Sequence, residues 1–90
     1  MEIIFDPKKN ALNGRKHRIS LSRANDFDFE NALYSVDNRE DYGEVRYQAI
    51  GFLDARLYAL VFVDSDDGDI RAISLRKATR HEAKDYEESR

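Results

Sequence analysis

The first part of the chain combines a short apolar run with a helical pattern. Residues 2–5 are mostly apolar and predict a short strand. Asp6 and Pro7 then place an N-cap before a proline at the first helical position, where the missing N–H group costs nothing. We therefore expect a helix that begins at Pro7 and ends near Lys16 or His17.

A second helix is predicted soon after the first. Ser20 is a suitable N-cap, and the positions behind it fit a helix of about nine residues. A full capping box needs Glu or Gln three residues after the cap, but Arg23 stands there, so only half of this signal is present. The residues expected to face inward are Leu21, Ala24 and Phe27 or Phe29.

The apolar period changes to two from Ala32 onward, which predicts strands. In the strand that begins at Val45, Tyr47 belongs to one face and Arg46 to the other. The strand that begins at Leu57 is apolar on both faces, as is typical of a central strand covered on both sides. The predicted strands are residues 33–37, 45–52, 57–63 and 70–77.

The acidic segment DSDDGD, residues 64–69, has the composition of a calcium loop. An EF-hand loop carries glycine at its sixth position, whereas the glycine here is fifth when counted from Asp64. Asp67 and Gly68 between two strands are instead typical of a hairpin turn. We therefore predict a β-hairpin and no metal site.

A capping box opens the last predicted element. Thr79 and Glu82 have the Thr-x-x-Glu spacing that begins a helix, and Ala83 and Tyr86 are its main apolar residues. Such a polar helix packs weakly and can be displaced. The whole pattern predicts one α+β domain over residues 1–90, with two N-terminal helices and one C-terminal helix around an antiparallel meander of about four strands.

Composition narrows the class of protein. The chain has 90 residues, of which 41% are hydrophobic, enough for a single small core. It has no cysteine, which excludes disulfides and thiolate metal sites and fits a reducing compartment. No apolar run approaches the length of a membrane span, so we expect a cytoplasmic protein that does not contact membranes.

Charge is distributed unevenly along the chain. Residues 1–23 hold six Lys or Arg against two acids, a net charge of +4, and residues 70–90 hold six against four, a net charge of +2. Residues 24–69 hold three against twelve, a net charge of −9. The basic ends can fold onto one positive face, or the charges can simply solvate separate surfaces.

Three arginines gather where the last strand meets the last helix. On a regular strand, Arg76 faces opposite Ile73 and Leu75, whereas Arg71 shares their side. If Ile73 and Leu75 face the core, Arg76 points to the open side of the sheet. Arg80 lies in the first helical turn, where free N–H groups and the helix dipole favour an anion.

Arg46 has the same orientation as Arg76 in its own strand. Arg46, Arg76 and Arg80 can therefore converge on a phosphate, or they can form surface pairs with carboxylates, such as Glu44 with Arg46. The two histidines, His17 and His81, are more typical of surface residues than of metal ligands.

Several segments together resemble one family. These are FDPKKNALNGRKH at residues 5–17, Ser20, Glu44-Val-Arg46, Gly51, and RAISLRKATRHEAKDYE at residues 71–87. In this order and spacing they resemble the BrnT toxins of bacterial type II toxin–antitoxin systems. That family typically carries W-D-x-x-K, N-x-x-K-H-G, E-x-R, a glycine, R-x-I-S-A-R-x-A, and then Glu and Tyr.

The chain departs from the family pattern at three positions. Phe5 replaces the usual Trp, Arg18 the usual Gly and Leu75 the usual Ala. Phe5 keeps an aromatic plane without the indole N–H group. Arg18 stands where a helix end prefers a residue that tolerates the left-handed region.

The resemblance implies a small RelE-like domain that cleaves RNA and inhibits translation without a metal or other cofactor. The 2′-hydroxyl attacks the adjacent phosphate, and arginines stabilise the charge that develops there. Arg76, Arg80 and Arg46 are the expected catalytic cations, and Glu44 or His17 the expected base or acid. The residues predicted to contact RNA are Lys16, Arg71, Lys77 and Tyr86.

The resemblance also implies a partner. This is a ribbon-helix-helix antitoxin that neutralises the toxin and represses their shared operon, so operator DNA is reached only through the antitoxin. Because such an antitoxin is dimeric, we expect two copies of this chain per complex. The acidic middle block is expected to attract the basic partner. The antitoxin is expected to bury part of the sheet or the surface near Arg76 and Arg80. Two alternatives to a ribonuclease stay open, a non-catalytic RNA-binding module and a protein-interaction module.

Overall fold

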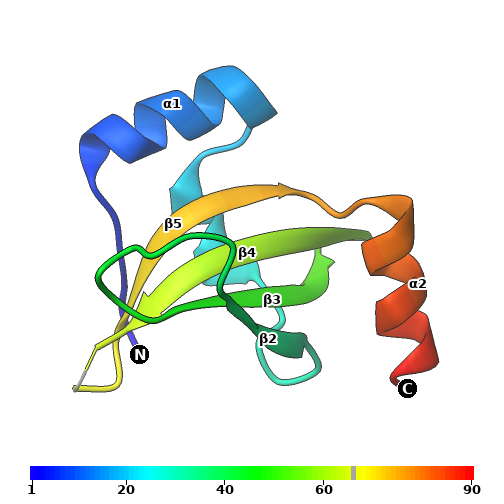
Figure 1. The fold of residues 1–90 in the computed structure, drawn as a ribbon. Helices are drawn as coiled ribbons and strands as arrows, with labels where there is room; N and C mark the ends of the chain where they lie inside the picture. The colour runs from blue at the N-terminus through cyan, green and yellow to red at the C-terminus, as the bar shows by residue number, and fades with distance from the viewer. Residues whose placement is uncertain (66) are drawn as a thin grey trace.

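The computed structural model describes residues 1–65 and 67–90. A five-stranded sheet with the order β1-β5-β4-β3-β2 forms its centre, and Figure 1 shows α1 along one edge of this sheet and α2 at one end. The helical elements are α1 (Pro7–His17), the 3-10 helix η1 (Leu21–Asp26) and α2 (Arg80–Glu88). The strands are β1 (Ile3–Ile4), β2 (Leu33–Asp37), β3 (Arg46–Leu53), β4 (Arg56–Asp64) and β5 (Ile70–Lys77).

The α+β prediction is confirmed, and both ends of every predicted strand lie within one residue of the observed ends. The sheet has five strands instead of about four, because β1 pairs with β5 in parallel and the other neighbours are antiparallel. The hairpin between β4 and β5 is also confirmed, with Gly68 at φ 88°. Asp66, part of the acidic segment considered as a calcium loop, lies outside the described residues.

Both predicted caps of the long helices are present. The side chain of Asp6 accepts a hydrogen bond from the Lys8 N–H group at the start of α1. Thr79 and Glu82 form the complete capping box of α2, each side chain accepting from the other's backbone N–H group. These local bonds explain why both helices begin where the sequence predicts.

The second helix is shorter than expected. Ser20 caps it as predicted, but it is a six-residue 3-10 helix instead of an α-helix of about nine residues. Phe27 leaves the helix in an extended conformation and forms a bridge to Leu53 in β3. This pairing ends the helix, and it places the Phe27 ring in the core while Phe29 is only partly buried.

The main core lies between η1 and one side of the sheet, which we call the core face. Its fully buried side chains include Leu21 from η1, Leu53 from β3, Leu60 from β4 and Leu75 from β5. Gly51 belongs to this layer, because a Cβ atom there would lie 2.8 Å from Cζ of Phe27. The close packing of the segment that follows η1 therefore requires the glycine at this position.

The opposite side of the sheet carries Arg46, Arg71 and Arg76, and we call it the arginine face. One end of this face is covered by α2, where Tyr86 packs with Ile50 and Ala59. The remainder of this face is reached by the loop between β2 and β3, which passes in front of the sheet in Figure 1.

A β-bulge in β5 corrects one expectation. Arg71 pairs with Val63 and Ser74 with Val61, so two β4 steps correspond to three residues of β5. The extra residue shifts the alternation, which places Arg71 on the same face as Arg76 and opposite Leu75. The prediction that Arg71 shares a side with Leu75 is therefore wrong.

Asn13 closes the edge of β5 beyond the end of β1. Its side-chain amide donates to Leu75 O at 2.8 Å and to Ile19 O at 3.0 Å, and it accepts from Leu75 N at 3.0 Å. The side chain thus replaces a neighbouring strand. This buried amide fixes α1 alongside β5 and explains an asparagine in the middle of a helix.

Candidate RNA-binding and catalytic site

A basic groove lies where the end of α1 meets the end of β5. Two adjoining cavities of about 530 Å³ and about 450 Å³ form it, and Lys16 and His17 line both. The first cavity is lined by Lys16, His17, Arg18, Ile19, Arg23, Tyr58, Arg76 and Lys77. The second is lined by Lys9, Leu12, Asn13, Arg15, Lys16, His17, Ile73 and Ser74.

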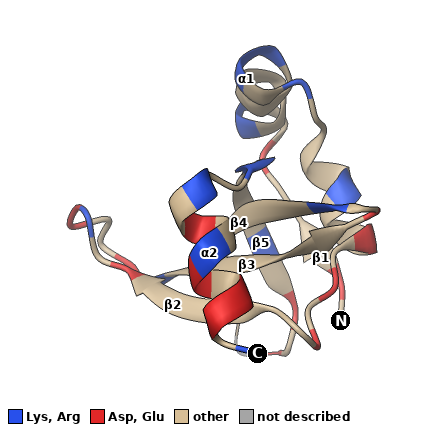
Figure 2. Cartoon of the chain, turned by 90° about the vertical axis from the view of Figure 1, so that its right-hand side faces the viewer, with Lys and Arg blue, Asp and Glu red and all other residues tan. Residues whose placement is uncertain are grey.

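The groove joins the two basic ends of the chain. Lys16, Arg18 and Arg23 come from the N-terminal block, and Arg76 and Lys77 from the C-terminal block. In Figure 2 the blue bands of α1 and the segment after it lie in the upper part of the molecule, whereas most red bands lie lower. The fold thus brings basic residues from both chain ends to one surface, which is the first of the two arrangements considered for the charges.

Arg18 lies in a conformation that is unusual for an arginine. It is the C-cap of α1 with φ 62° and ψ 30°, in the left-handed region, and its N–H group donates to Gly14 O at 3.0 Å. The expected conflict between Arg18 and the helix end is therefore present. The side chain is exposed and adds a guanidinium to the groove.

His17 is the one histidine in the groove. It is partly buried, and this burial together with the nearby cations Lys16 and Arg76 lowers its pKa from the ordinary value of 6.5. The charged form is disfavoured because it would add a third cation in a partly desolvated place. His17 is therefore mainly neutral at pH 7 and can accept a proton.

Arg76 links the groove to α2. Its guanidinium forms two hydrogen bonds with Glu82, at 2.7 and 2.9 Å, while its side chain also lines the larger cavity. Gln48 donates to the same carboxylate at 3.4 Å. The Arg76 hydrogen bonds lower the pKa of Glu82 to about 2, so the carboxylate stays ionised and orients the guanidinium.

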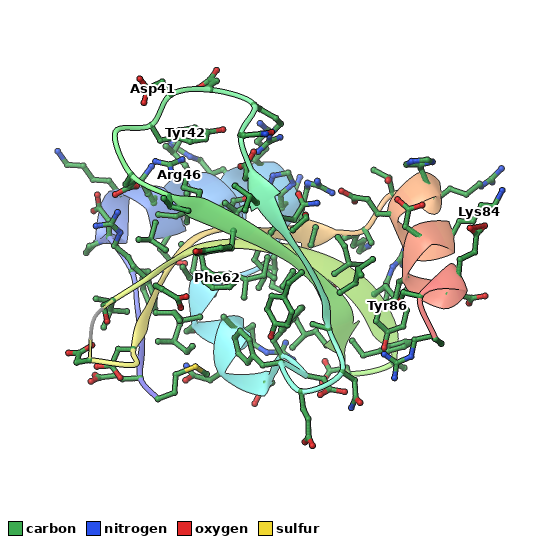
Figure 3. The ribbon with its side chains drawn as sticks, turned by 60° about the horizontal axis from the view of Figure 1, so that its bottom comes forward. Asp41, Tyr42, Arg46, Phe62, Lys84 and Tyr86 are labelled. Atoms are coloured by element: carbon green, nitrogen blue, oxygen red, sulfur yellow. The ribbon has the colours of Figure 1, made fainter. Side chains whose placement is uncertain are left out.

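A second cluster lies at the other end of the arginine face. Glu44 accepts from Arg71 at 2.6 Å and from Arg46 at 3.2 Å, and the Arg46 guanidinium lies 3.9 Å from the centre of the Tyr42 ring. Figure 3 shows Tyr42 and Arg46 together at the foot of the loop between β2 and β3. The hydrogen bond from Arg71, with that from Arg46, lowers the pKa of Glu44, which makes it a weak base.

The predicted site residues therefore divide into separate groups. Lys16, His17, Arg76 and Lys77 meet in the groove. Arg71 and Arg76 pair with β4 residues four positions apart, roughly 13 Å along the strand, which separates the Glu44 cluster from the groove. The structure thus does not place Arg46 beside Arg76, as convergence on one phosphate would need.

The two α2 residues lie elsewhere. Within the described part of the chain, Arg80 is exposed in the first turn of α2 and lies outside both cavities. Tyr86 is only 6% exposed, and its ring packs edge to face on Phe52 with centroids 5.7 Å apart. The packing of α2 on the sheet therefore removes Tyr86 from the surface, against the prediction that it contacts RNA.

Three polar residues of the larger cavity were not among the predicted site residues. Arg18, Arg23 and Tyr58 line the larger cavity. A sequence signal existed for Arg18: a helix end of this kind prefers glycine, so a charged side chain there suggests a role other than stability. No sequence signal places Tyr58 there, because its position depends on the pairing of Tyr58 with Lys77 across the sheet.

The described residues contain no group of three or more His, Asp or Glu side chains that could hold a metal ion. In the same part of the chain, none of the helices has the length and apolar character needed to cross a membrane.

Comparisons with known proteins agree with the fold. The model of the family "Ribonuclease toxin, BrnT, of type II toxin-antitoxin system" matches residues 5–82. The crystal structure of the Brucella abortus ribonuclease toxin BrnT is similar, with a TM-score of 0.67 and 25% sequence identity over 89% of this chain and 99% of that chain. A search of curated proteins gave no match.

Proposed function

The chain belongs to the family of BrnT ribonuclease toxins of type II toxin–antitoxin systems, and from this premise we propose that it is a metal-independent endoribonuclease that binds RNA in the basic groove. It cleaves RNA in the cytoplasm and thereby inhibits translation. One observation supports this location of the site. Lys16 and His17 line both cavities, so an RNA strand that follows the groove passes His17.

Phosphate binding follows from the cations of the groove. Lys16, Arg18 and Lys77 are exposed, the first two at the end of α1 and the third at the end of β5, so they can approach an anion from two sides. The second cavity adds the apolar side chains of Leu12 and Ile73, which suit contact with a base. A nucleotide with its phosphate in the larger cavity and its base in the other would span His17.

Proton transfer is assigned to His17. Neutral His17 takes the proton from the 2′-hydroxyl, whose oxygen bonds to phosphorus while the bond from phosphorus to the 5′-oxygen breaks. The leaving oxygen takes a proton from solvent, and the products are a 2′,3′-cyclic phosphate and a 5′-hydroxyl. A positioned base of this kind contributes about 10²- to 10⁴-fold to the rate.

His17 is a better candidate for the base than Glu44. Glu44 is engaged by two arginines that lower its pKa, whereas His17 lies within the groove and its pKa is lowered by burial and by the nearby cations, which favours the neutral, proton-accepting form. Arg76, oriented by Glu82, is the donor placed to stabilise charge on the phosphate.

The antitoxin partner is proposed to be a ribbon-helix-helix protein. Because that fold is an obligate dimer, two copies of this chain join each complex, related by the two-fold axis of the antitoxin. Operator DNA is contacted by the antitoxin alone.

The proposed activity is tested with purified chain and single-stranded RNA in the presence of EDTA. We expect cleavage to products with cyclic phosphate ends, a loss of rate of about 10²-fold or more in His17→Ala, and a similar loss in Arg76→Ala. His81→Ala is the matched control, because His81 is 84% exposed on α2 and should leave the rate unchanged.

Two results would contradict the proposal. Tight RNA binding without any cleavage would favour the non-catalytic RNA-binding module. Equal rates in His17→Ala and His81→Ala would remove His17 as the base. The pH profile adds a further check, because activity that needs neutral His17 must be lost as pH falls through a pKa below 6.5.

A further inference from the structure

Part of the core face is not covered by η1. A cavity of about 400 Å³ opens there, near the N-terminus and the start of β5, and Met1, Tyr34, Phe62 and Ile70 are among its lining residues. We call the surface formed by Met1, Phe29, Tyr34, Val36, Tyr47 and Phe62 the aromatic patch.

The rings of the aromatic patch are held around one buried residue. Phe62 is 5% exposed and forms the floor, with the Tyr47 ring stacked at 5.7 Å between centroids. Tyr34 and Phe29 meet Phe62 edge to face at 6.2 and 6.5 Å, and the Tyr34 hydroxyl donates to Phe29 O at 2.6 Å. The cavity is therefore preformed, and filling it costs little ordering of side chains.

Large apolar side chains around this floor are exposed. The register pairs Val36 with Tyr47 and Tyr34 with Ala49, so both β2 residues belong to the core face. Val36 is 56% exposed, Tyr34 46% and Met1 73%. Exposed apolar side chains that adjoin one another beside a cavity are typical of an interaction surface.

The same residues lie on an edge strand. β2 is the last strand in the sheet order, so its outer edge offers backbone groups to a further strand. An extended segment that pairs with β2 would direct every second side chain to the core face. Those side chains would fall next to Tyr34 and Val36, above the cavity.

Charge around the patch selects the kind of partner. Asp64 lines the cavity, and burial together with Asp28 and Asp64 raises the pKa of Tyr34, so both carboxylates lie close to that phenol. A second copy of this chain would bring the same acidic residues and be repelled. A segment with lysine or arginine beside its apolar residues is complementary.

We propose that the aromatic patch and the β2 edge are the anchor site of the antitoxin, which adds an extended, positively charged segment to β2 and inserts an apolar side chain above Phe62. This inference rests on the proposed function only in taking the partner to be a toxin-neutralising protein. It narrows the broader expectation that the antitoxin covers some part of the sheet or the surface near Arg76 and Arg80.

The anchor site and the basic groove are separated along β5. Ile70 lines the aromatic cavity and Lys77 the groove, at opposite ends of the strand, roughly 23 Å apart by strand rise. Substitutions can therefore remove antitoxin binding and RNA cleavage independently. An antitoxin anchored at the patch must reach the groove with another segment or act on it indirectly.

The experiment measures binding of the purified antitoxin encoded beside this chain. Tyr34→Glu and Val36→Glu should each weaken the affinity by about 30-fold or more, as for a central interface residue. Ile4→Glu is the matched control: Ile4 is 45% exposed in a strand, but it alternates with buried Ile3 and so lies on the other side of the sheet. The Ile4→Glu variant should bind the antitoxin with the affinity of the unsubstituted chain.

Two further measurements separate this inference from the proposed function. Tyr34→Glu should keep its RNA cleavage, since it lies outside the groove, and a chain that cleaves no RNA can still be tested for antitoxin binding. Hydrogen exchange on the unsubstituted complex needs no variant to fold. We expect slower exchange in residues 33–37, with or without a change in residues 74–80.

Several outcomes would overturn the proposal. These are unchanged affinity in both glutamate variants, no binding of the antitoxin to the unsubstituted chain, or slower exchange confined to residues 74–80. A loss of antitoxin binding in Lys16→Ala alone would place the antitoxin in the basic groove instead.

Discussion

At the scale of single residues, Arg18 combines a structural cost with a contribution to the site. Its left-handed backbone costs an L-residue about 1–2 kcal/mol relative to the right-handed region, a cost that glycine does not have. Its guanidinium lies at the larger cavity of the groove. An arginine at this position is therefore better explained by the proposed RNA binding than by stability.

Replacing Arg18 with glycine should separate the two effects. We expect Arg18→Gly to raise the free energy of unfolding by about 1 kcal/mol and to weaken RNA binding, because strain and charge are lost together. Urea denaturation and RNA titration measure the two effects. Arg15→Gly is the control: it also removes a groove cation, but from a helical position, so it should lower stability by about 1 kcal/mol. Equal stability changes in the two variants would contradict the assignment.

At the scale of elements, Glu82 joins α2 to the sheet through several polar contacts. Glu82 completes the capping box, pairs with Arg76 and accepts from Gln48, so one carboxylate connects α2 to β5 and β3. Tyr86 adds the main apolar contact. The packing of α2 on the sheet therefore depends in part on the Glu82 carboxylate, whose ionisation changes with pH.

The pH dependence of Glu82→Gln follows from this arrangement. The pKa of Glu82 is about 2 in the folded chain, below its ordinary value, so its contribution is complete above roughly pH 4.3 and is lost as pH falls toward the folded value. Glu82→Gln should lower the free energy of unfolding by about 1–2 kcal/mol at pH 7. This difference from the unsubstituted chain should shrink as pH falls from 4 to 2.

Urea denaturation over this pH range provides the measurement. Glu88→Gln is the control, because Glu88 makes only an exposed pair with Lys84 at 3.9 Å and should change stability by less than about 0.5 kcal/mol. A difference between Glu82→Gln and the unsubstituted chain that stays constant with pH would show that the cap geometry matters and the charge does not.

At the scale of the whole molecule, the proposed binding of RNA to an acidic protein depends on the separation of charge over its surface. The net charge is −3, yet the basic residues of both chain ends meet at one groove. The acidic residues near the aromatic patch lie at the other end of β5. Local potential, not net charge, then decides which partner approaches each surface.

Salt dependence tests this separation of charge. If Lys16, Arg18 and Lys77 each contact a phosphate, the logarithm of RNA affinity should fall with the logarithm of salt concentration with a slope near −2, since each contact contributes about −0.7. Lys16→Ala should reduce the steepness by about 0.7. Lys84→Ala, on the exposed side of α2, should leave the slope unchanged. A slope near zero in the unsubstituted chain would show that the groove is not an RNA site.

Local signals determined much of this protein in advance. The caps at Asp6 and Thr79, the Asp67-Gly68 turn and the strand periods depend on neighbours within a few residues, and these elements lie where the sequence predicts them. The order and spacing of short motifs were sufficient for the family, which the match over residues 5–82 confirms.

The tertiary structure decided how those elements meet. The bulge in β5 moved Arg71 to the arginine face, the packing of α2 buried Tyr86, and the amide of Asn13 placed α1 beside Leu75, so that His17 came to lie near Arg76. Each of these depends on contacts between residues far apart in the chain, and no local period records such contacts. The groove and the aromatic patch are therefore properties of the folded molecule, whereas the residues that form them were already visible in the sequence.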